Sequence, residues 1–394
     1  MSISGQYNIS LKINEEKYDL LLSSVRHLAI FENASDLLPT LEMQLVDPIY
    51  DRNLIPIYDG SIIEISLTPT VDQSQENKSS GMEEGSDTWM SFRVFKCEIV
   101  TESNVDILNI LAYYNSPEYF SIAAFDYYEG SSSSVAEKIA TKCNLKFDGD
   151  TSNDTQIWYQ AGQTSGAFLH EVARHAWKDN NSCFVNCVTK DGVLKFFNLG
   201  DRIKSSPVWD FINTNVMFIP LKDKEVAVTS MLSSPNSGTL NRWRGYGVVS
   251  GNENFISGEY NSVHVDNIQK STEKLAINKD LAKPTRYEVG PIDIGNTHKN
   301  YFKSYNQNIR LLSTFSDTIK VITNRPKKIA LLDRVMFKEQ KDTPGSLRMN
   351  YSGEYFVTHI GTFLINGAIT INYGLTKEGV NTVSSDSGDR TDLL

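Results

Sequence analysis

One order of elements occurs twice in this chain of 394 residues, and it constrains the fold more than any other feature. In the first copy, a strand-like run follows Ile57-Tyr58-Asp59-Gly60, and after a polar loop come candidate strands over 92–99 and 107–113. In the second copy, a similar run follows Leu331-Leu332-Asp333-Arg334, with candidate strands over 355–363 and 368–375. This recurrence favours two related β-barrels with an α+β insertion between their strands.

The N-terminal segment has the pattern of a β domain. Residues 7–13 alternate polar and apolar side chains with period two, which predicts a half-buried strand. Similar runs predict strands over 25–31 and 41–45, and the Asp59-Gly60 turn predicts a further strand after it. Residues 70–88 are polar throughout and predict a mobile loop. We therefore expect a first β-barrel over 1–128.

A helical pattern replaces the strand pattern after residue 128. Serines at 131–134 are suited to capping a helix that includes 135–140. Thr164-Ser165 would cap a second helix over 167–177, whose apolar stripe includes Phe168, Leu169 and Val172. Two candidate strands then flank an Asp191-Gly192 turn. This order predicts an inserted α+β domain over 129–200.

The remaining chain gives weaker signals. We expect a second β-barrel formed by 201–232 and 300–377, with a second insertion over 233–299 that contains a helix near 268–282. A flexible C-terminal tail is expected over 378–394. The predicted fold class is mainly β with α+β insertions: two tandem related β-barrels, similar to tail-tube barrels, plus small inserted α+β domains.

Charge and hydropathy exclude several classes of protein. The formal net charge is −10, which argues against a protein that binds nucleic acid through its phosphates. No run of eighteen apolar residues is present, so we expect no membrane span. The first residues lack the pattern of a signal peptide, which predicts synthesis and retention in a cytoplasm.

The sequence offers no convincing catalytic or metal-binding motif. The four cysteines are too few for a disulfide scaffold and are expected to be reduced and buried. His170-Glu171 resembles the start of a zinc-peptidase motif, but Arg174 occupies the place of the second histidine, and His175 lies too far round the helix. The serines after Gly130 lack the lysine of a nucleotide-binding loop. We predict no catalytic, cofactor-binding or metal-binding residues.

Four passages carry a resemblance to a known family: Leu41 to Leu67, Phe125 to Tyr128, Gln163 to Asp201, and Gly353 to Thr376. In order and character they resemble the baseplate hub protein of contractile-tailed bacteriophages. The chain is also similar to the first part of the type VI secretion spike protein and to phage late control protein D. The stretch 233–300 has no clear counterpart in this resemblance.

The resemblance implies a structural protein rather than an enzyme. It implies a homotrimer that forms a ring of six barrels, two from each chain, which adapts the six-fold tail tube to the three-fold central spike. The implied partners are therefore a second and third copy, the spike, the tail tube protein and other baseplate proteins. The implied location is the tail baseplate of the virion, assembled in the host cytoplasm. Leu393 and Leu394, the apolar end of the tail, are the expected spike contact.

Two other classes of function stay open at this point. A tail-associated hydrolase would need a catalytic constellation within 129–300. A carbohydrate-binding β module of a host-contact protein would need an exposed aromatic platform. The aromatic and basic cluster Arg242-Trp243-Arg244 could stack on bases or a sugar, but a cluster of this kind in an acidic chain is more often a packing or subunit contact.

Overall fold

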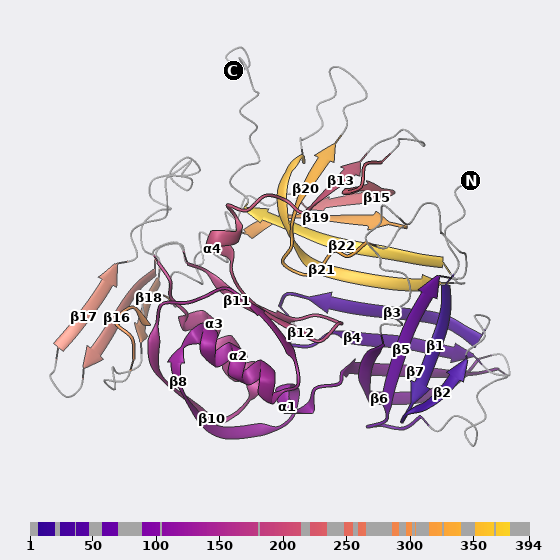
Figure 1. The fold of residues 1–394 in the computed structure, drawn as a ribbon, viewed down its shortest axis with the longest axis horizontal. Coiled ribbons are helices and arrows are strands. Elements are labelled where there is room, and N and C mark those ends of the chain that lie inside the picture. The colour runs from indigo at the N-terminus through magenta and orange to yellow at the C-terminus, as the bar shows by residue number, and fades with distance from the viewer. Residues whose placement is uncertain are drawn as a thin grey trace, which may run out of the picture.

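The computed structural model is mainly β, with a small helical unit beside a large sheet (Figure 1). It describes residues 7–19, 24–35, 37–46, 57–69, 89–102, 105–179, 182–213, 221–234, 248–254, 259–264, 286–290, 297–301, 304, 315–324, 327–339, 351–365 and 368–378. The predicted loop over 70–88, the helix near 268–282, the Arg242-Trp243-Arg244 cluster and the tail beyond 378 lie outside these residues.

Seven strands among the described residues form the first β region, in the order β2-β1-β5-β6-β7-β4-β3 across the sheet. Their bounds are β1 Tyr7–Ile13, β2 Glu16–Asp19, β3 Val25–Asn33, β4 Thr40–Val46, β5 Ile62–Pro69, β6 Met90–Glu102 and β7 Val105–Tyr114. The strands predicted from period-two alternation are confirmed. In β4, for example, Leu41, Met43 and Leu45 are buried and alternate with more exposed residues.

Seven further strands form the second β region, in the order β14-β13-β20-β21-β22-β19-β15. Their bounds are β13 Trp209–Asn213, β14 Glu225–Val228, β15 Ser230–Ser234, β19 Phe315–Thr323, β20 Arg334–Glu339, β21 Gly353–Ile365 and β22 Ala368–Glu378. If the strands of each region are numbered from one to seven along the chain, both regions have the same strand order across the sheet, 2-1-5-6-7-4-3. Only β13 differs in direction, because it runs parallel to both neighbours whereas β1 runs antiparallel to both of its own.

The two β regions are joined edge to edge into one 14-stranded sheet. The joint is an antiparallel pairing of β21 with β3, in which His359–Leu364 lie opposite Asn33–Leu28 (Figure 1). Side chains from both regions contribute to one continuous apolar core. The expected division of the chain into barrels and insertions stays a prediction; β8, described next, runs across residue 128.

The unit that follows the first region wraps a curved two-stranded ribbon around two helices (Figure 1). Its elements are α1 Pro117–Phe120, β8 Ala123–Ser131, α2 Ser132–Lys142, β9 Lys146–Gly149, β10 Thr155–Thr164, α3 Ser165–His175, β11 Phe184–Val188, β12 Val193–Asn198 and α4 Leu199–Arg202. Both predicted helix caps are confirmed: Ser131 Oγ accepts the Ser134 N–H, and Thr164 Oγ1 accepts the Ala167 N–H.

The end of α3 corrects the predicted helix over 167–177. The helix ends at His175, and the backbone of Ala176 is extended, with ψ of 138°. The Trp177 N–H donates to Asp154 Oδ2 at 2.6 Å instead of to a helix carbonyl. A tertiary hydrogen bond thus ends the helix two residues before its apolar pattern stops.

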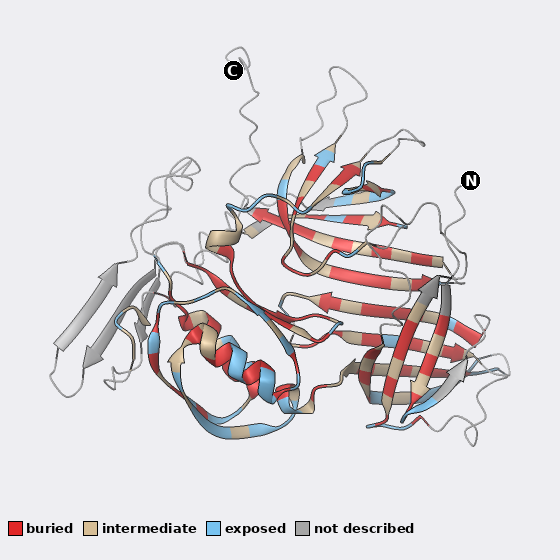
Figure 2. Cartoon of the chain, in the orientation of Figure 1, coloured by how far each residue is buried: buried red, intermediate tan, exposed pale blue. Residues whose placement is uncertain are grey.

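The sheet β11-β12-β9 lies between two apolar cores. Cys187 and Phe197 pack into the core of the large sheet, whereas Phe184 and Phe196 pack against the helices. Burial on both faces explains why β11 and β12 lack the polar alternation of a surface strand (Figure 2). The edge strand β9 is mostly exposed. The Asp191-Gly192 hairpin is confirmed, with Gly192 at φ of 70°. Cys143, Cys183 and Cys187 are buried, Cys97 is partly exposed, and none of the four forms a disulfide.

A third unit contains three strands, β16 Val248–Asn254, β17 Glu259–His264 and β18 Arg286–Gly290. They form a separate sheet in the order β17-β16-β18, within the predicted second insertion. No helix in the described part of the chain is long and apolar enough to cross a membrane.

Candidate functional site

The histidines of α3 have separate environments. His170 is exposed, whereas His175 is buried and stacks on the Tyr301 ring with centroids 3.7 Å apart. His175 Nε2 lies 3.3 Å from Glu171 Oε1. Among the described residues, no group of three or more His, Cys, Asp or Glu side chains is placed to hold a metal ion. The structure therefore gives His170-Glu171 no metal-binding partner set among those residues.

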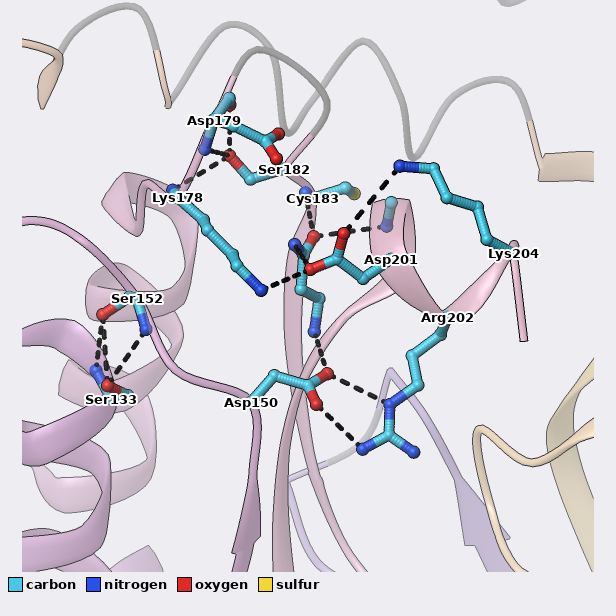
Figure 3. Close-up of polar contacts among 12 residues, drawn as sticks. Ser133, Asp150, Ser152, Lys178, Asp179, Ser182, Cys183, Asp201, Arg202 and Lys204 are labelled. Carbon is cyan, nitrogen blue, oxygen red and sulfur yellow. Dashed lines mark hydrogen bonds and ion pairs between the residues drawn. The ribbon is translucent and has the colours of Figure 1, made fainter.

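Two carboxylates near α4 organise a cluster of polar contacts (Figure 3). Asp150 accepts two hydrogen bonds from the Arg202 guanidinium, at 3.0 and 3.1 Å, and one from the Asn198 N–H at 2.9 Å. Asp201 accepts a hydrogen bond from Lys178 Nζ at 2.7 Å. That hydrogen bond holds the pKa of Asp201 below its usual value, and the same pairing raises the pKa of Lys178.

This cluster has the chemistry of a structural network. Arg202 also lies over the Phe197 ring, 3.7 Å from its centroid, so the guanidinium is held on one side by a carboxylate and on the other by an aromatic face. Both carboxylates are bound by cations or N–H groups of the fold itself, as is typical of carboxylates that hold elements together. The contacts join α4 and the segment after α3 to the end of β9.

A second set of polar contacts lies where the inserted unit meets the joint between the β regions. Lys190, in the β11–β12 turn, pairs with Glu32 of β3: Nζ lies 3.2 Å from Oε2, and the Lys190 N–H donates to Oε1 at 2.9 Å. Lys195, on β12, donates to the Leu331 carbonyl at 2.7 Å and lies 3.3 Å from Asp333 Oδ1. One hairpin is thus anchored to both β regions, so it clamps the joint.

Lys190 and Glu32 form a largely buried ion pair. Glu32 has 3 % of its side chain exposed and Lys190 has 29 %. Burial lowers the pKa of Lys190, but the charges of Glu32 and Asp191 raise it by more, so the net direction is upward. Lys190 therefore stays charged at neutral pH, and loss of Glu32 would leave a largely buried ammonium group without its counter-ion.

Open strand edges are the feature best suited to assembly. The outer half of β6 is exposed, and Ile99 and Val100 have 42 % and 41 % of their surface accessible. On the short strand β15, Leu232 is 64 % exposed. Within the described residues, β15 has one partner strand, β19, and the segment 98–101 of β6 has one partner strand, β7. Unpaired N–H and C=O groups on such edges can pair with another chain.

A group of exposed aromatic side chains is another surface feature of the structure. The outer face of the β8–β10 ribbon carries Phe125, Tyr127 and Tyr159, with 83 %, 73 % and 54 % of their surface accessible. Tyr127 and Tyr159 lie directly opposite each other in the pairing. The opposite face of the ribbon covers the helices with buried residues such as Trp158. Three neighbouring exposed rings of this kind form a surface that can bind a partner.

The site residues predicted from the sequence lie in parts of the chain that the structure does not describe. Leu393 and Leu394 lie outside the described residues, as does the Arg242-Trp243-Arg244 cluster. Sequence reasoning missed the Lys190–Glu32 and Lys195–Asp333 clamp, because its partners are far apart in the chain. The sequence did contain a sign of the open edge of β6. Phe95, Ile99 and Val100 are all apolar, but they do not lie on one face of a strand with period two, so a single core cannot bury all three.

The known proteins that resemble this chain were found by comparing structures rather than sequences. No protein-family model matches the chain, and a search of curated proteins finds no match. A tail protein from Neisseria meningitidis MC58 matches with a TM-score of 0.60 at 10 % identity, over 96 % of this chain and 98 % of that one. The 43 kDa tail protein of prophage MuSo2 from Shewanella oneidensis matches with a TM-score of 0.61 at 10 % identity, over 95 % and 99 % of the two chains.

A type VI secretion component of E. coli, the c3393 protein, also matches, with a TM-score of 0.45 at 9 % identity over 93 % of this chain and 76 % of that one. The first two matches span nearly the whole of both chains. The mainly β fold predicted from the sequence is thus confirmed, and the chain has the fold of phage tail proteins.

Proposed function

We propose that this protein is the structural hub of a contractile-tail baseplate, a ring that adapts a six-fold tail tube to a three-fold central spike. The observation that carries the proposal is the repeated β region. Two seven-strand regions with one strand order are joined edge to edge in each chain. The fold shared with phage tail proteins supports this reading.

The repeat suits a symmetry mismatch. Three copies of a chain with two similar β regions present six similar units around one axis, while the chains themselves obey three-fold symmetry. One face can then make six near-equal contacts with a tube. The inserted units, which differ between the two regions, give the ring a three-fold feature that can make three contacts with a spike. The expected partners are two further copies, the spike, the tube and other baseplate proteins in the virion.

The oligomeric mass tests this function. We expect a particle of about 130 kDa, three times the 44.3 kDa chain, from the protein alone or with its spike. Negative-stain images of that particle should show a three-fold ring with a central hole. A chain that stays monomeric with and without the spike would overturn the hub function.

The C-terminal tail is the proposed spike contact. Leu393 and Leu394 end a segment that is otherwise rich in Ser, Asp, Thr and Gly. We expect deletion of 380–394 to weaken spike binding, measured by calorimetry, and to leave the trimer intact. The matched variant Leu393→Ser with Leu394→Ser should reproduce the loss if the two leucines make the contact. Unchanged affinity in both variants would leave the tail without this role.

A second candidate function rests on the exposed aromatic face of the β8–β10 ribbon. Phe125, Tyr127 and Tyr159 could form a platform for sugar rings, which would make the chain a carbohydrate-binding module of a host-contact protein. The test is retention on immobilised host surface polysaccharide, compared with a Tyr127→Ala, Tyr159→Ala variant. Retention that these changes abolish, from a protein that stays monomeric, would favour this candidate over the hub.

A further inference from the structure

The strands β6 and β21 are equivalent residue by residue. Each is the first strand of a hairpin that closes in the same way: Glu102 pairs with Val105, and Ile365 pairs with Ala368. Counting back from these ends aligns the irregularity between Val94 and Lys96 with the one between Val357 and His359. A β-bulge at the same place in both strands bends both in the same way. The segment 98–101 of β6 therefore corresponds to 361–364 of β21.

The strands β3 and β15 are equivalent in the same sense. In the first region, Thr40 of β4 pairs with Tyr113 of β7 and with Phe31 of β3. In the second region, Thr318 of β19 pairs with Thr376 of β22 and with Ser234 of β15. The hairpin alignment that equates Val105 with Ala368 also equates Tyr113 with Thr376. Residues 231–234 of β15 therefore correspond to 28–31 of β3.

Within one chain, the edges of β21 and β3 are paired with each other, whereas the equivalent edges of β6 and β15 are open among the described residues. Along the outer edge of β21, residues 353–356 pair with β20, and 359–364 pair with β3. Along the outer edge of β6, residues 90–93 pair with β5 in the same manner. Beyond them, 98–101 have no strand partner on that edge among the described residues, and β15 has none on its outer edge.

We propose that β15 of one copy pairs antiparallel with β6 of the next copy, in the register that joins β3 to β21 within the chain. This register places Met231 opposite Thr101, Leu232 opposite Val100, and Ser233 opposite Ile99. It covers the exposed side chains of Leu232 and Val100 with each other. The proposal rests on the ring of the proposed function and names the contact that closes it.

A second copy is the occupant because the chain already contains a contact of this type. The β21–β3 joint shows that an edge with this bulge accepts a strand from the neighbouring region. The path β6-β7-β4-β3-β21-β22-β19-β15 leaves a β6-type edge at one end and a β3-type edge at the other. Such a head-to-tail contact closes into a ring when the rotation between copies permits it. Closure also removes edges that would otherwise favour aggregation.

Disulfide cross-linking tests the register in the assembled protein. Cysteines replace Val100 and Leu232 in a Cys97→Ser background, and the oxidised trimer is run on a non-reducing gel. We expect most chains to migrate as covalent trimers. The matched control, Lys96→Cys with Leu232→Cys, places its thiols about 13 Å apart along the same strand face, beyond disulfide reach. The within-chain equivalent, Ala29→Cys with Phe363→Cys, calibrates how well this pair geometry forms a disulfide.

Charge exchange tests the same contact without disulfide geometry. Val100→Asp with Leu232→Asp opposes two like charges, and we expect it to weaken trimer formation at least about tenfold in sedimentation. Val100→Lys with Leu232→Asp opposes unlike charges and should restore the trimer. Because both residues are exposed in the single chain, neither variant should change its melting temperature by more than a few degrees.

The outcomes separate the two proposals. Failure of the unmodified protein to form any ring overturns the hub function. A trimer that tolerates the Asp-Asp variant and does not cross-link through residues 100 and 232 overturns the strand pairing alone. Cross-linking in register, with loss and rescue by charge, supports both.

Discussion

Asp154 determines where α3 ends. Its carboxylate accepts hydrogen bonds from Ser132 N–H at 2.9 Å, Ser132 Oγ at 2.6 Å and Trp177 N–H at 2.6 Å. It therefore joins the first residue of α2 to the segment that follows α3. A buried carboxylate with three donors is stable in the apolar interior, and it fixes both backbone segments in position.

His298 is a second residue whose neighbours fix its chemical state. Its Nε2 lies 3.0 Å from the His175 carbonyl, and the Asn300 N–H donates to its Nδ1 at 3.2 Å. A neutral ring that carries its proton on Nε2 satisfies both contacts. Burial lowers the pKa of the imidazole, and this outweighs the hydrogen bond to His175, which raises it.

The lowered pKa predicts acid sensitivity. The unfolded chain binds a proton at His298 near the ordinary pKa of about 6.5, whereas the folded chain resists protonation until lower pH. The free energy of unfolding should therefore fall as the pH drops from about 7.5 to about 5.5. Urea unfolding at both pH values measures this. His298→Gln should lose less stability over this pH interval than the natural protein. The control variant Lys299→Gln, at an exposed neighbouring position, should lose as much stability as the natural protein. Equal losses in all three proteins would contradict the assignment.

The apolar face of α3 supports a second prediction at this scale. Leu169 is fully buried among the helices and the strands that cover them. We expect Leu169→Ala to lower the free energy of unfolding by roughly 2–5 kcal/mol, since it leaves a cavity. His170→Ala, the adjacent exposed position, should change it by less than about 0.5 kcal/mol and leave assembly intact. Loss of assembly in the His170 variant, with folding preserved, would indicate a functional role for that residue.

At the scale of elements, the β11–β12 hairpin holds the joint between the β regions. It reaches β3 through Lys190 and Glu32, and it reaches the segment before β20 through Lys195 and Asp333. Gly192 at the turn leaves no space for a side chain, because an added Cβ would lie 2.1 Å from Tyr114 Oη. The glycine therefore allows the hairpin turn to lie directly against Tyr114 of β7.

Breaking one ion pair of this clamp should be costly. Glu32→Gln leaves the Lys190 ammonium beside a neutral amide, and we expect a loss of roughly 2–4 kcal/mol in the free energy of unfolding. The combined change Glu32→Gln with Lys190→Gln should recover much of this loss, since no unpaired charge remains. Glu64→Gln is the matched control: its pair with Lys12 is more exposed, so the cost should stay below about 1 kcal/mol. Equal costs at Glu32 and Glu64 would contradict the clamp.

At the scale of the whole molecule, the fold alternates a repeated β region with insertions that differ between the two copies. In the proposed trimer, the repeat would provide similar units around a ring, and the insertions would make those units distinguishable. Net charge is a property of the same scale: at −10, the chain as a whole repels a polyanion such as DNA.

This charge predicts how the protein behaves toward DNA. We expect no measurable complex with duplex DNA at physiological salt and micromolar protein, in a gel-shift assay. Low salt strengthens phosphate contacts, so a shift that appears only there and disappears at physiological salt agrees with the prediction. A complex that persists at physiological salt would contradict it.

The sequence by itself determined the local structure. Period-two alternation located strands of the first β region such as β1 and β4, Ser131 and Thr164 marked the starts of α2 and α3, and Asp191-Gly192 marked a hairpin, whereas β8, β9, β10 and β13 were not predicted. These signals succeed because caps, turns and burial patterns depend on neighbours within a few residues. The recurring order of elements also indicated a second β region, because the order of predicted strands and loops can be compared directly between two parts of the sequence.

Only the tertiary structure decided the contacts between distant segments. The end of α3 depends on Asp154, and the joint depends on Glu32 and Lys190. No local pattern predicts that β13 runs parallel to both of its neighbours. These contacts join residues far apart in sequence, and their energies depend on a geometry that no local pattern records. The same holds for the open edges of β6 and β15, which are edges only because the sheet order leaves them unpaired among the described strands.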